Sequence, residues 1–220
     1  VFGAPDSGFT RLMRDLTLAE PTLVLVHYGE NEAYAGDAGL AAFRQGLERL
    51  LAEIAQATAA RIVLLGPRQH ENLGPPLPDP SGYNAQLGRY NAAMREVAED
   101  HALPFVDLNT VLPVDPAQPL TSNGLHLTPE GSRKMANRLA ARLLAPVDPP
   151  YDVLDTPRGR ALQQAIAEKN ELFFHRHRPQ NETYLFLFRK HEQGNNAAEV
   201  FQFDPLIESK EQEIARLRQP

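Results

Sequence analysis

The stretch LTSNGLHLTPEG, residues 120–131, places a histidine on a glycine-containing turn directly before a helix. Thr128 is a favourable N-cap and Pro129 a favourable first helical residue, so the sequence predicts that a helix begins there. His126 is therefore expected in a loop, two residues outside the helix cap. A loop held by a rigid scaffold suits an imidazole that transfers protons, and a surface histidine without such a role is the alternative.

Three apolar runs upstream of this turn have the character of buried strands. The first is LVLV, residues 23–26, which lies between Pro21 and Gly29 and predicts a buried parallel strand. The second and third are RIVLLG, residues 61–66, and PFVDL, residues 104–108. Amphipathic patterns over about residues 9–16, 38–57 and 83–102 predict helices between and around these strands.

This alternation of helices and strands over residues 1–145 predicts a three-layer α/β domain with a parallel sheet. Three strands alone would bury such a sheet poorly. We therefore expect at least one further strand ahead of Val1, so that the sheet is incomplete at the N-terminus and the chain is a piece of a longer protein.

The residues that follow the first two strands are candidates for a site. Gly29-Glu30-Asn31-Glu32 lies at the carboxyl end of the first strand, and ligands bind at this edge in open parallel sheets. Asn31 is thus a candidate site residue. His70 and Glu71 follow the second strand and could line the same edge, although their proline-rich loop is also typical of a surface excursion.

Composition excludes several classes of function. The 220 residues contain no cysteine, which rules out disulfides, thiolate metal sites and a cysteine nucleophile. The net charge is -6 and the basic residues are scattered, so we expect no nucleic-acid partner. No apolar run approaches the ~18 residues that a membrane span requires. These features leave the cellular compartment open.

Residues 146–220 differ in character from the domain before them. Four prolines, at positions 146, 149, 150 and 157, predict a linker. Helical patterns follow over residues 162–174 and about 205–217, and the segment between them is rich in aromatic residues and histidine. No histidine spacing there matches a metal motif, so we expect no metal. We interpret residues 146–220 as an extended and helical tail whose aromatic side chains dock onto the domain or onto a partner.

The block around Asn31 after one strand, and Asn123-Gly124-Leu125-His126 before the last helix of the domain, resemble motifs of the SGNH or GDSL hydrolases. These proteins are flavodoxin-like esterases, and the resemblance covers roughly residues 1–145. It implies that Asn31 donates a hydrogen bond to an oxyanion and that His126 is the catalytic base. It also implies a small-molecule or carbohydrate ester as the substrate, with no cofactor.

The sequence departs from this family at two positions. Asp6-Ser7 imitates the nucleophile block of the family, but no strand precedes it and it lies too close to Asn31 for an intervening βα unit. We therefore interpret Ser7 as a helix cap and expect the nucleophilic serine upstream of Val1. Asn123 stands where the family has the triad aspartate. Its amide oxygen could accept a hydrogen bond from Nδ1–H of the imidazole, but it could not stabilise an imidazolium by charge.

Three functions remain open from the sequence. The leading hypothesis is a serine-type hydrolase of carboxylic esters in the intact parent protein, with acetyl esters of carbohydrates as one substrate class. The second is a catalytically silent binding module that keeps a carbohydrate-sized cleft. The third is an interaction domain whose tail recruits a partner.

Overall fold

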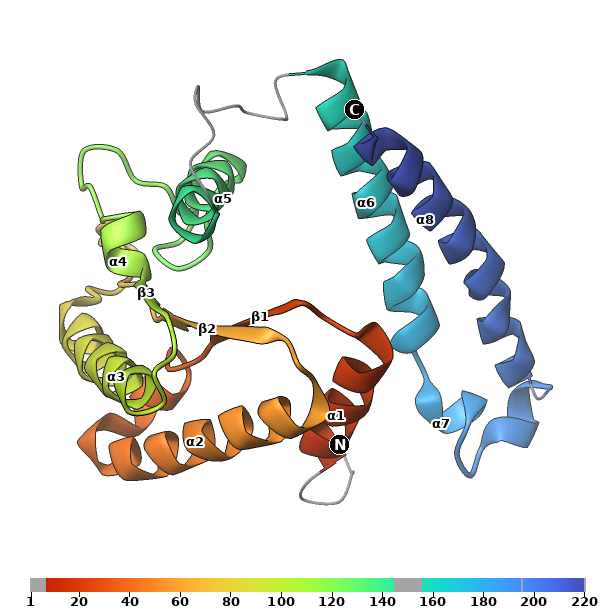
Figure 1. The fold of residues 1–220 in the computed structure, drawn as a ribbon, viewed down its shortest axis with the longest axis horizontal. Coiled ribbons are helices and arrows are strands. Elements are labelled where there is room, and N and C mark those ends of the chain that lie inside the picture. Colours follow the sequence, from red (N-terminus) through yellow and green to blue (C-terminus); the bar gives the residue numbers. More distant parts are fainter. Residues whose placement is uncertain (1–6, 145–155, 195, 220) are drawn as a thin grey trace. The chain divides into compact units, whose positions relative to one another are not determined.

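The computed structural model describes residues 7–144, 156–194 and 196–219 (Figure 1). The chain divides into two compact units, Val1–Ala145 and Pro146–Pro220.

The first unit is built on three parallel strands in the order β1-β2-β3. Their bounds are β1 (Leu23–His27), β2 (Arg61–Gly66) and β3 (Phe105–Asp107). The register places Val26 of β1 opposite Leu64 of β2, and Leu65 of β2 opposite Val106 of β3. All three carboxyl ends therefore open onto the same edge of the sheet.

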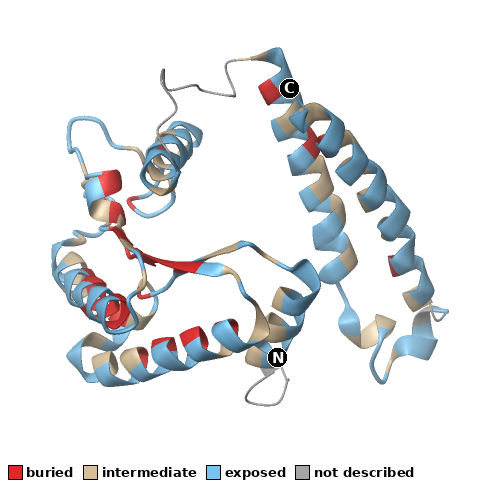
Figure 2. Ribbon diagram, viewed as in Figure 1, coloured by how far each residue is buried: buried red, intermediate tan, exposed pale blue. Residues whose placement is uncertain are grey.

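Helices cover both faces of this sheet (Figure 1). Their bounds are α1 (Ser7–Ala19), η1 (Glu32–Gly39), α2 (Leu40–Ala57), α3 (Ser81–Asp100), α4 (Leu108–Val111) and α5 (Pro129–Leu143). Side chains of α1, α2 and α3 pack against one face, around Val26 and Leu64, and α4 and α5 pack against the other, around Val63 and Leu65. Figure 2 shows buried residues gathered in β2, α2 and α3. The predicted three-layer α/β fold is confirmed.

Strand β1 is less buried than its sequence predicted. Val26 is 3% exposed because it points into the core formed with α2 and α3, but Leu25 on the other face is 43% exposed. Leu23 at the start of that face packs against the buried cluster that contains Val63 and Leu65. The prediction of a buried strand is therefore wrong for Leu25, because β1 lies at an edge of the described sheet and Leu25 stays exposed there.

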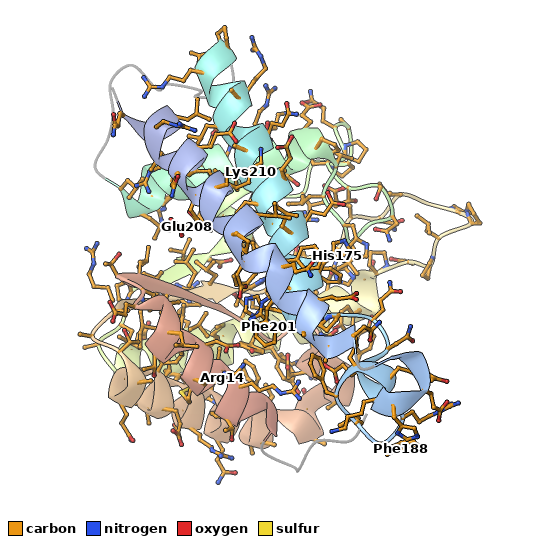
Figure 3. All side chains as sticks on the ribbon, turned by 90° about the vertical axis from the view of Figure 1, so that its right-hand side faces the viewer. Arg14, His175, Phe188, Phe201, Glu208 and Lys210 are labelled. Atoms are coloured by element: carbon orange, nitrogen blue, oxygen red, sulfur yellow. The ribbon has the colours of Figure 1, made fainter. Side chains whose placement is uncertain are left out.

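The second unit consists mainly of two helices, α6 (Pro157–His177) and α8 (Phe203–Arg218), which pack along each other (Figure 1). Ion pairs join them, including Lys169 to Glu211 at 3.0 Å and Arg176 to Asp204 at 2.6 Å. Lys210, labelled in Figure 3 on α8, also pairs with a glutamate of α6.

Short helical turns connect these two helices. They are α7 (Glu182–Leu185), η3 (Lys190–Gln193) and η4 (Asn196–Gln202). Within the tail that was expected to be extended and helical, the described residues of this connection form short helical turns, with left-handed backbone at Asn181 and Gly194. Phe188 is 79% exposed, and Figure 3 shows it on the connection between α7 and η3. Docking of these aromatic side chains onto a partner stays a prediction.

Candidate active site

His126 lies on a closed loop, which we call the histidine loop and define as residues 120–127. An antiparallel bridge between Thr121 and Leu127 closes it, and the Ser122 N–H donates to the His126 carbonyl at 2.9 Å. Helix α5 begins directly afterwards, where the Thr128 hydroxyl accepts from the Gly131 N–H at 3.0 Å. The predicted N-cap is thus confirmed, and the exposed imidazole of His126 lies two residues before it.

The side chain of Asn123 contacts the His126 imidazole, but not with the predicted atom. Its Oδ1 accepts from the backbone N–H of Leu125 at 3.2 Å and of His126 at 2.9 Å. This leaves Nδ2 facing the ring, 3.0 Å from Nδ1 of His126. Because an amide nitrogen can only donate, Nδ1 is the acceptor and Nε2 carries the ring proton. The prediction that the Asn123 oxygen accepts from Nδ1–H is wrong, because two backbone donors already occupy that oxygen.

Neither Asp107 nor Asp115 hydrogen-bonds to the His126 ring in place of Asn123. Asp107 accepts from Asn91, Arg95 and Asn109, and Asp115 accepts from the backbone N–H of Ala117. Among the described residues, the hydrogen-bond partner of the His126 ring is therefore an amide and no carboxylate. No carboxylate of the described residues hydrogen-bonds to this imidazole in the way that the triad aspartate of a serine protease does.

Asn31 follows β1 on a tight turn at the carboxyl edge of the sheet. Gly29 has φ +106°, and a Cβ atom there would lie 3.3 Å from Pro67 on the loop after β2, so glycine suits this approach. The Gly29 N–H donates to the Glu32 carboxylate at 2.9 Å. Asn31 is exposed, and within the described part of the chain its amide makes no side-chain hydrogen bond. The amide is thus available to a ligand.

Tyr83 of α3 ties this turn to the loop after β2. Its hydroxyl donates to the Glu30 carbonyl, and its ring stacks on Tyr34 at 4.3 Å and lies 5.1 Å from the His70 ring. Burial and the nearby Tyr34 and Glu30 raise the pKa of Tyr83 to about 12, so the hydroxyl stays protonated at neutral pH. The loop after β2 in turn contacts the histidine loop, where the Glu71 N–H donates to the Gly124 carbonyl at 2.8 Å.

Asn31 therefore belongs to the turn after β1, and His126 to a loop that contacts the loop after β2. Sequence reasoning missed two residues of this arrangement, Arg68 and Tyr83, and it missed the role of Glu71. Arg68 and Glu71 are each 5% exposed. An Arg–Glu pair three residues apart directly after a buried strand was the available signal. Convergence of Asn31 and His126 on a single substrate stays a prediction.

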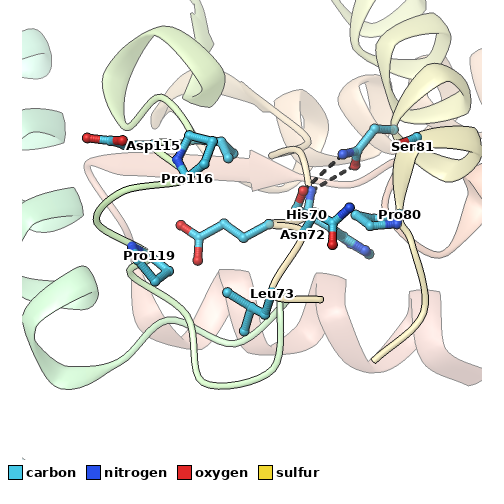
Figure 4. A pocket seen from close by; sticks show the side chains of 11 residues that line it. His70, Asn72, Leu73, Pro80, Ser81, Asp115, Pro116 and Pro119 are labelled. Atoms are coloured by element: carbon cyan, nitrogen blue, oxygen red, sulfur yellow. Dashed lines mark hydrogen bonds between the residues drawn. The ribbon is translucent and has the colours of Figure 1, made fainter. Parts of the chain in front are cut away.

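A pocket of about 370 Å³ opens beside this edge (Figure 4). Its lining residues are His70, Glu71, Asn72, Leu73, Pro80, Ser81, Asn84, Val114, Asp115, Pro116 and Pro119. The side chain of Asn84 bonds to both backbone groups of His70, at 2.8 and 2.9 Å, drawn as dashed lines in Figure 4. Burial lowers the pKa of His70, against the raising effect of Glu30, so this imidazole is neutral at pH 7. No group of three or more potential metal ligands occurs among the residues that the structure describes.

A parallel sheet with helices on both faces and polar loops at its carboxyl edge is the architecture of flavodoxin-like α/β proteins. Within that class the chain belongs to the GDSL-like lipase/acylhydrolase family, whose model matches residues 3–134, more than half of the chain. The resemblance that the sequence suggested is thereby confirmed. A search of curated proteins finds no match.

The chain is similar to several solved structures. A peptidoglycan O-acetylesterase aligns with a TM-score of 0.52 and 22% identity over 64% of this chain, which spans 43% of that protein. A lipase/acylhydrolase from Enterococcus faecalis aligns with a TM-score of 0.49 and 21% identity, over 64% of this chain and 70% of the other. An acetylxylan esterase from Geobacillus stearothermophilus aligns with a TM-score of 0.46 and 22% identity, over 60% and 64%. No helix among the described residues is long and apolar enough to cross a membrane.

Proposed function

We propose that the first unit carries the base and the oxyanion donor of a hydrolase of carboxylic esters. Membership of the GDSL-like family supports the reaction class. The observation that carries the site assignment is the placement of an unengaged Asn31 amide and an exposed His126 imidazole on loops at one edge of the sheet. Such edge loops on a rigid sheet are where ligands bind in this class of fold.

The proposed chemistry needs one group that accepts the proton of the nucleophile and one group that donates a hydrogen bond to the oxyanion. This step requires the tautomer with the ring proton on Nδ1: an oxygen nucleophile then attacks the ester carbonyl carbon while its proton passes to the free Nε2 of His126. The carbonyl oxygen becomes an oxyanion, which accepts a hydrogen bond from Nδ2–H of Asn31. Collapse of the tetrahedral intermediate expels the alcohol, which takes the proton back from Nε2 of His126.

We assign the nucleophile to none of the serine side chains that the structure describes in the first unit. Ser81 donates to Asp79 at 2.5 Å, and Ser122 donates to the His126 carbonyl at 3.3 Å rather than to its ring. Ser132 lies within α5. The side chain of Ser7 and all of Asp6 lie outside the described residues. Because the sequence favours Ser7 as a helix cap, we expect the 220-residue chain to hydrolyse short acyl esters poorly.

A catalytically silent binding module is the second candidate, and one observation favours it. Nδ2–H of Asn123 donates to Nδ1 of His126, so the proton sits on Nε2, the atom that would have to accept the proton of the nucleophile. In this tautomer the imidazole cannot serve as a base. The two candidates share one binding site and differ in whether the ring tautomer can change during the reaction.

Acetyl esters of carbohydrates are the substrate class that we propose. Tyr34 is 74% exposed and its ring stacks on Tyr83 at the same edge as Asn31. An exposed aromatic ring supported by a second ring offers an apolar face with a polar tip, which suits a sugar that is polar around its rim. The acetyl group would then lie toward Asn31.

Binding of an acetylated sugar tests this proposal independently of turnover. The full chain, labelled with ¹⁵N, is titrated with acetylated xylooligosaccharide and, as the control, with the same sugar after deacetylation. We expect the backbone amide signals of Asn31 and His126 to shift with the acetylated sugar alone, and Asn31→Ala to weaken binding about tenfold through loss of one hydrogen bond to the acetyl carbonyl. Equal shifts with both sugars would contradict the substrate class, and shifts elsewhere only would contradict the site.

A further inference from the structure

The carboxylate of Glu71 is buried between the end of β2 and the histidine loop. It is 5% exposed, and it accepts from the backbone N–H of Leu120 at 3.0 Å, from the N–H of Thr121 at 2.8 Å and from the Thr121 hydroxyl at 2.5 Å. Arg68, equally buried, places NH1 3.7 Å from the same carboxylate. A buried carboxylate is retained only where donors and a counter-charge satisfy it, and this one has both.

The backbone of Glu71 holds the other side of the same loop. Its N–H donates to the Gly124 carbonyl at 2.8 Å, and the Gly124 N–H donates to the Thr121 hydroxyl at 3.0 Å. The approach is close, since a Cβ atom on Gly124 would lie 2.6 Å from the Glu71 carbonyl oxygen. One residue thus contacts the histidine loop on both sides of Ser122 and Asn123.

We propose that Glu71 is a positioning residue that sets the conformation of the histidine loop and, through it, the contact between Asn123 and His126. Its significance for ester hydrolysis rests on the proposed function, but the positioning itself does not. Asn123 and His126 are exposed, so neither is held by packing in a core. The buried residues of this loop are Thr121 and Gly124, and both contact Glu71. The orientation of the exposed pair therefore derives from the anchored pair.

The substitution Glu71→Gln separates this role from simple space filling. The glutamine side chain has nearly the same shape, but it has one acceptor oxygen in place of two and adds an amide N–H₂ that faces the donors of Leu120 and Thr121. Glu99→Gln is the matched control, because Glu99 is exposed at the end of α3 and the same charge is removed there. Thr121→Val removes the hydroxyl that donates to Glu71, whereas Thr121→Ser keeps a hydroxyl at that position.

The experiment measures amide hydrogen exchange and the imidazole ¹⁵N signals of His126 in the full chain. We expect Glu71→Gln to speed exchange at Leu120 and Thr121 at least about tenfold, because each loses a charge-assisted hydrogen bond. Exchange at core amides such as that of Met94 should stay unchanged. The His126 ring signals should move from a single Nε2–H tautomer toward the average of a free imidazole. Glu99→Gln should change neither measurement.

Two results would overturn the proposal. Uniformly faster exchange throughout the first unit would make Glu71 a general structural residue, and unmoved His126 ring signals would show that the Asn123 contact forms without it. If Glu71→Gln fails to fold, two variants of Thr121 test the proposal instead. The His126 ring signals should lose the single Nε2–H tautomer in Thr121→Val and keep it in Thr121→Ser. Failure of the acetylated-sugar titration alongside changed ring signals would reject the proposed function and leave the positioning role intact.

Discussion

The amide of Asn123 determines which nitrogen of His126 carries the proton. A carboxylate at this position could accept from two backbone N–H groups with one oxygen and from Nδ1–H with the other, which leaves Nε2 free to accept a proton. An amide has one oxygen, and the backbone N–H groups of Leu125 and His126 occupy it. The change of one atom therefore reverses the direction of the hydrogen bond to the ring and the location of the ring proton.

His70 gives the first unit a pH dependence that belongs to one residue. Burial lowers its pKa below the ordinary value of about 6.5, so the unfolded chain binds more protons than the folded one below that pH. The free energy of unfolding should therefore fall as the pH drops from about 6.5 toward the lowered pKa, and level off below it. In His70→Phe, which keeps a ring beside Tyr83 but does not titrate, this fall should be shallower.

Denaturant unfolding between pH 5 and pH 8, with each protein referred to its own value at pH 8, measures the slope. Parallel curves for the two proteins would show that other groups cause the acid destabilisation.

At the scale of elements, the carboxyl edge is organised by loops that contact one another rather than by the strands themselves. The loop after β2 contacts the turn after β1 through Tyr83 and the histidine loop through Glu71. Gly124 is the position where the histidine loop comes closest to Glu71, with φ +85°. Glycine is therefore needed here for two separate reasons, the left-handed backbone conformation and the close approach to Glu71.

Two glycine substitutions separate these reasons. A Cβ atom on Gly74, which has φ +74°, would meet no atom within 4 Å, whereas a Cβ atom on Gly124 would lie 2.6 Å from the Glu71 carbonyl oxygen. Gly74→Ala should therefore cost only the backbone strain, roughly 1–2 kcal/mol of the free energy of unfolding. Gly124→Ala should cost more, about 3 kcal/mol, because the chain must also move away from Glu71. Equal costs by denaturant unfolding would contradict the close approach.

The sequence predicted those elements whose signals are local. Residues 61–66 form β2 as expected. Thr128 caps α5 because its hydroxyl accepts from the Gly131 N–H, which lies only three residues later in the chain. The short helical turns between α6 and α8 were not predicted from the sequence, and Asn181 adopts a left-handed conformation there.

For the molecule as a whole, the helix and sheet layers of the first unit could be predicted from the sequence, but the contacts between loops at the candidate site could not. The Tyr83–Glu30 and Glu71–Thr121 contacts join residues 53 and 50 positions apart, so no local pattern contains both partners. Asn31 and His126 could be proposed from the sequence because each stands in a short motif beside a strand or a helix cap. The direction of the Asn123 hydrogen bond could not be predicted, since it depends on which backbone N–H groups the loop turns toward the amide oxygen.

Turnover of an acetyl ester by Asn123→Asp tests the central claim most directly. p-Nitrophenyl acetate is assayed with the wild-type chain, with Asn123→Asp and with the double variant Asn123→Asp, His126→Gln. A carboxylate that accepts from Nδ1–H frees Nε2 to act as a base toward a serine or toward water, and general-base catalysis contributes about 10²–10⁴ in rate.

We predict low turnover for the wild-type chain, a gain of about 10² in Asn123→Asp, and loss of that gain in the double variant. Turnover that is unchanged by Asn123→Asp, or a gain that survives His126→Gln, would contradict the assignment of His126 as the base. High wild-type turnover that Ser7→Ala abolishes would contradict both the proposed effect of Asn123 and the exclusion of Ser7 as the nucleophile.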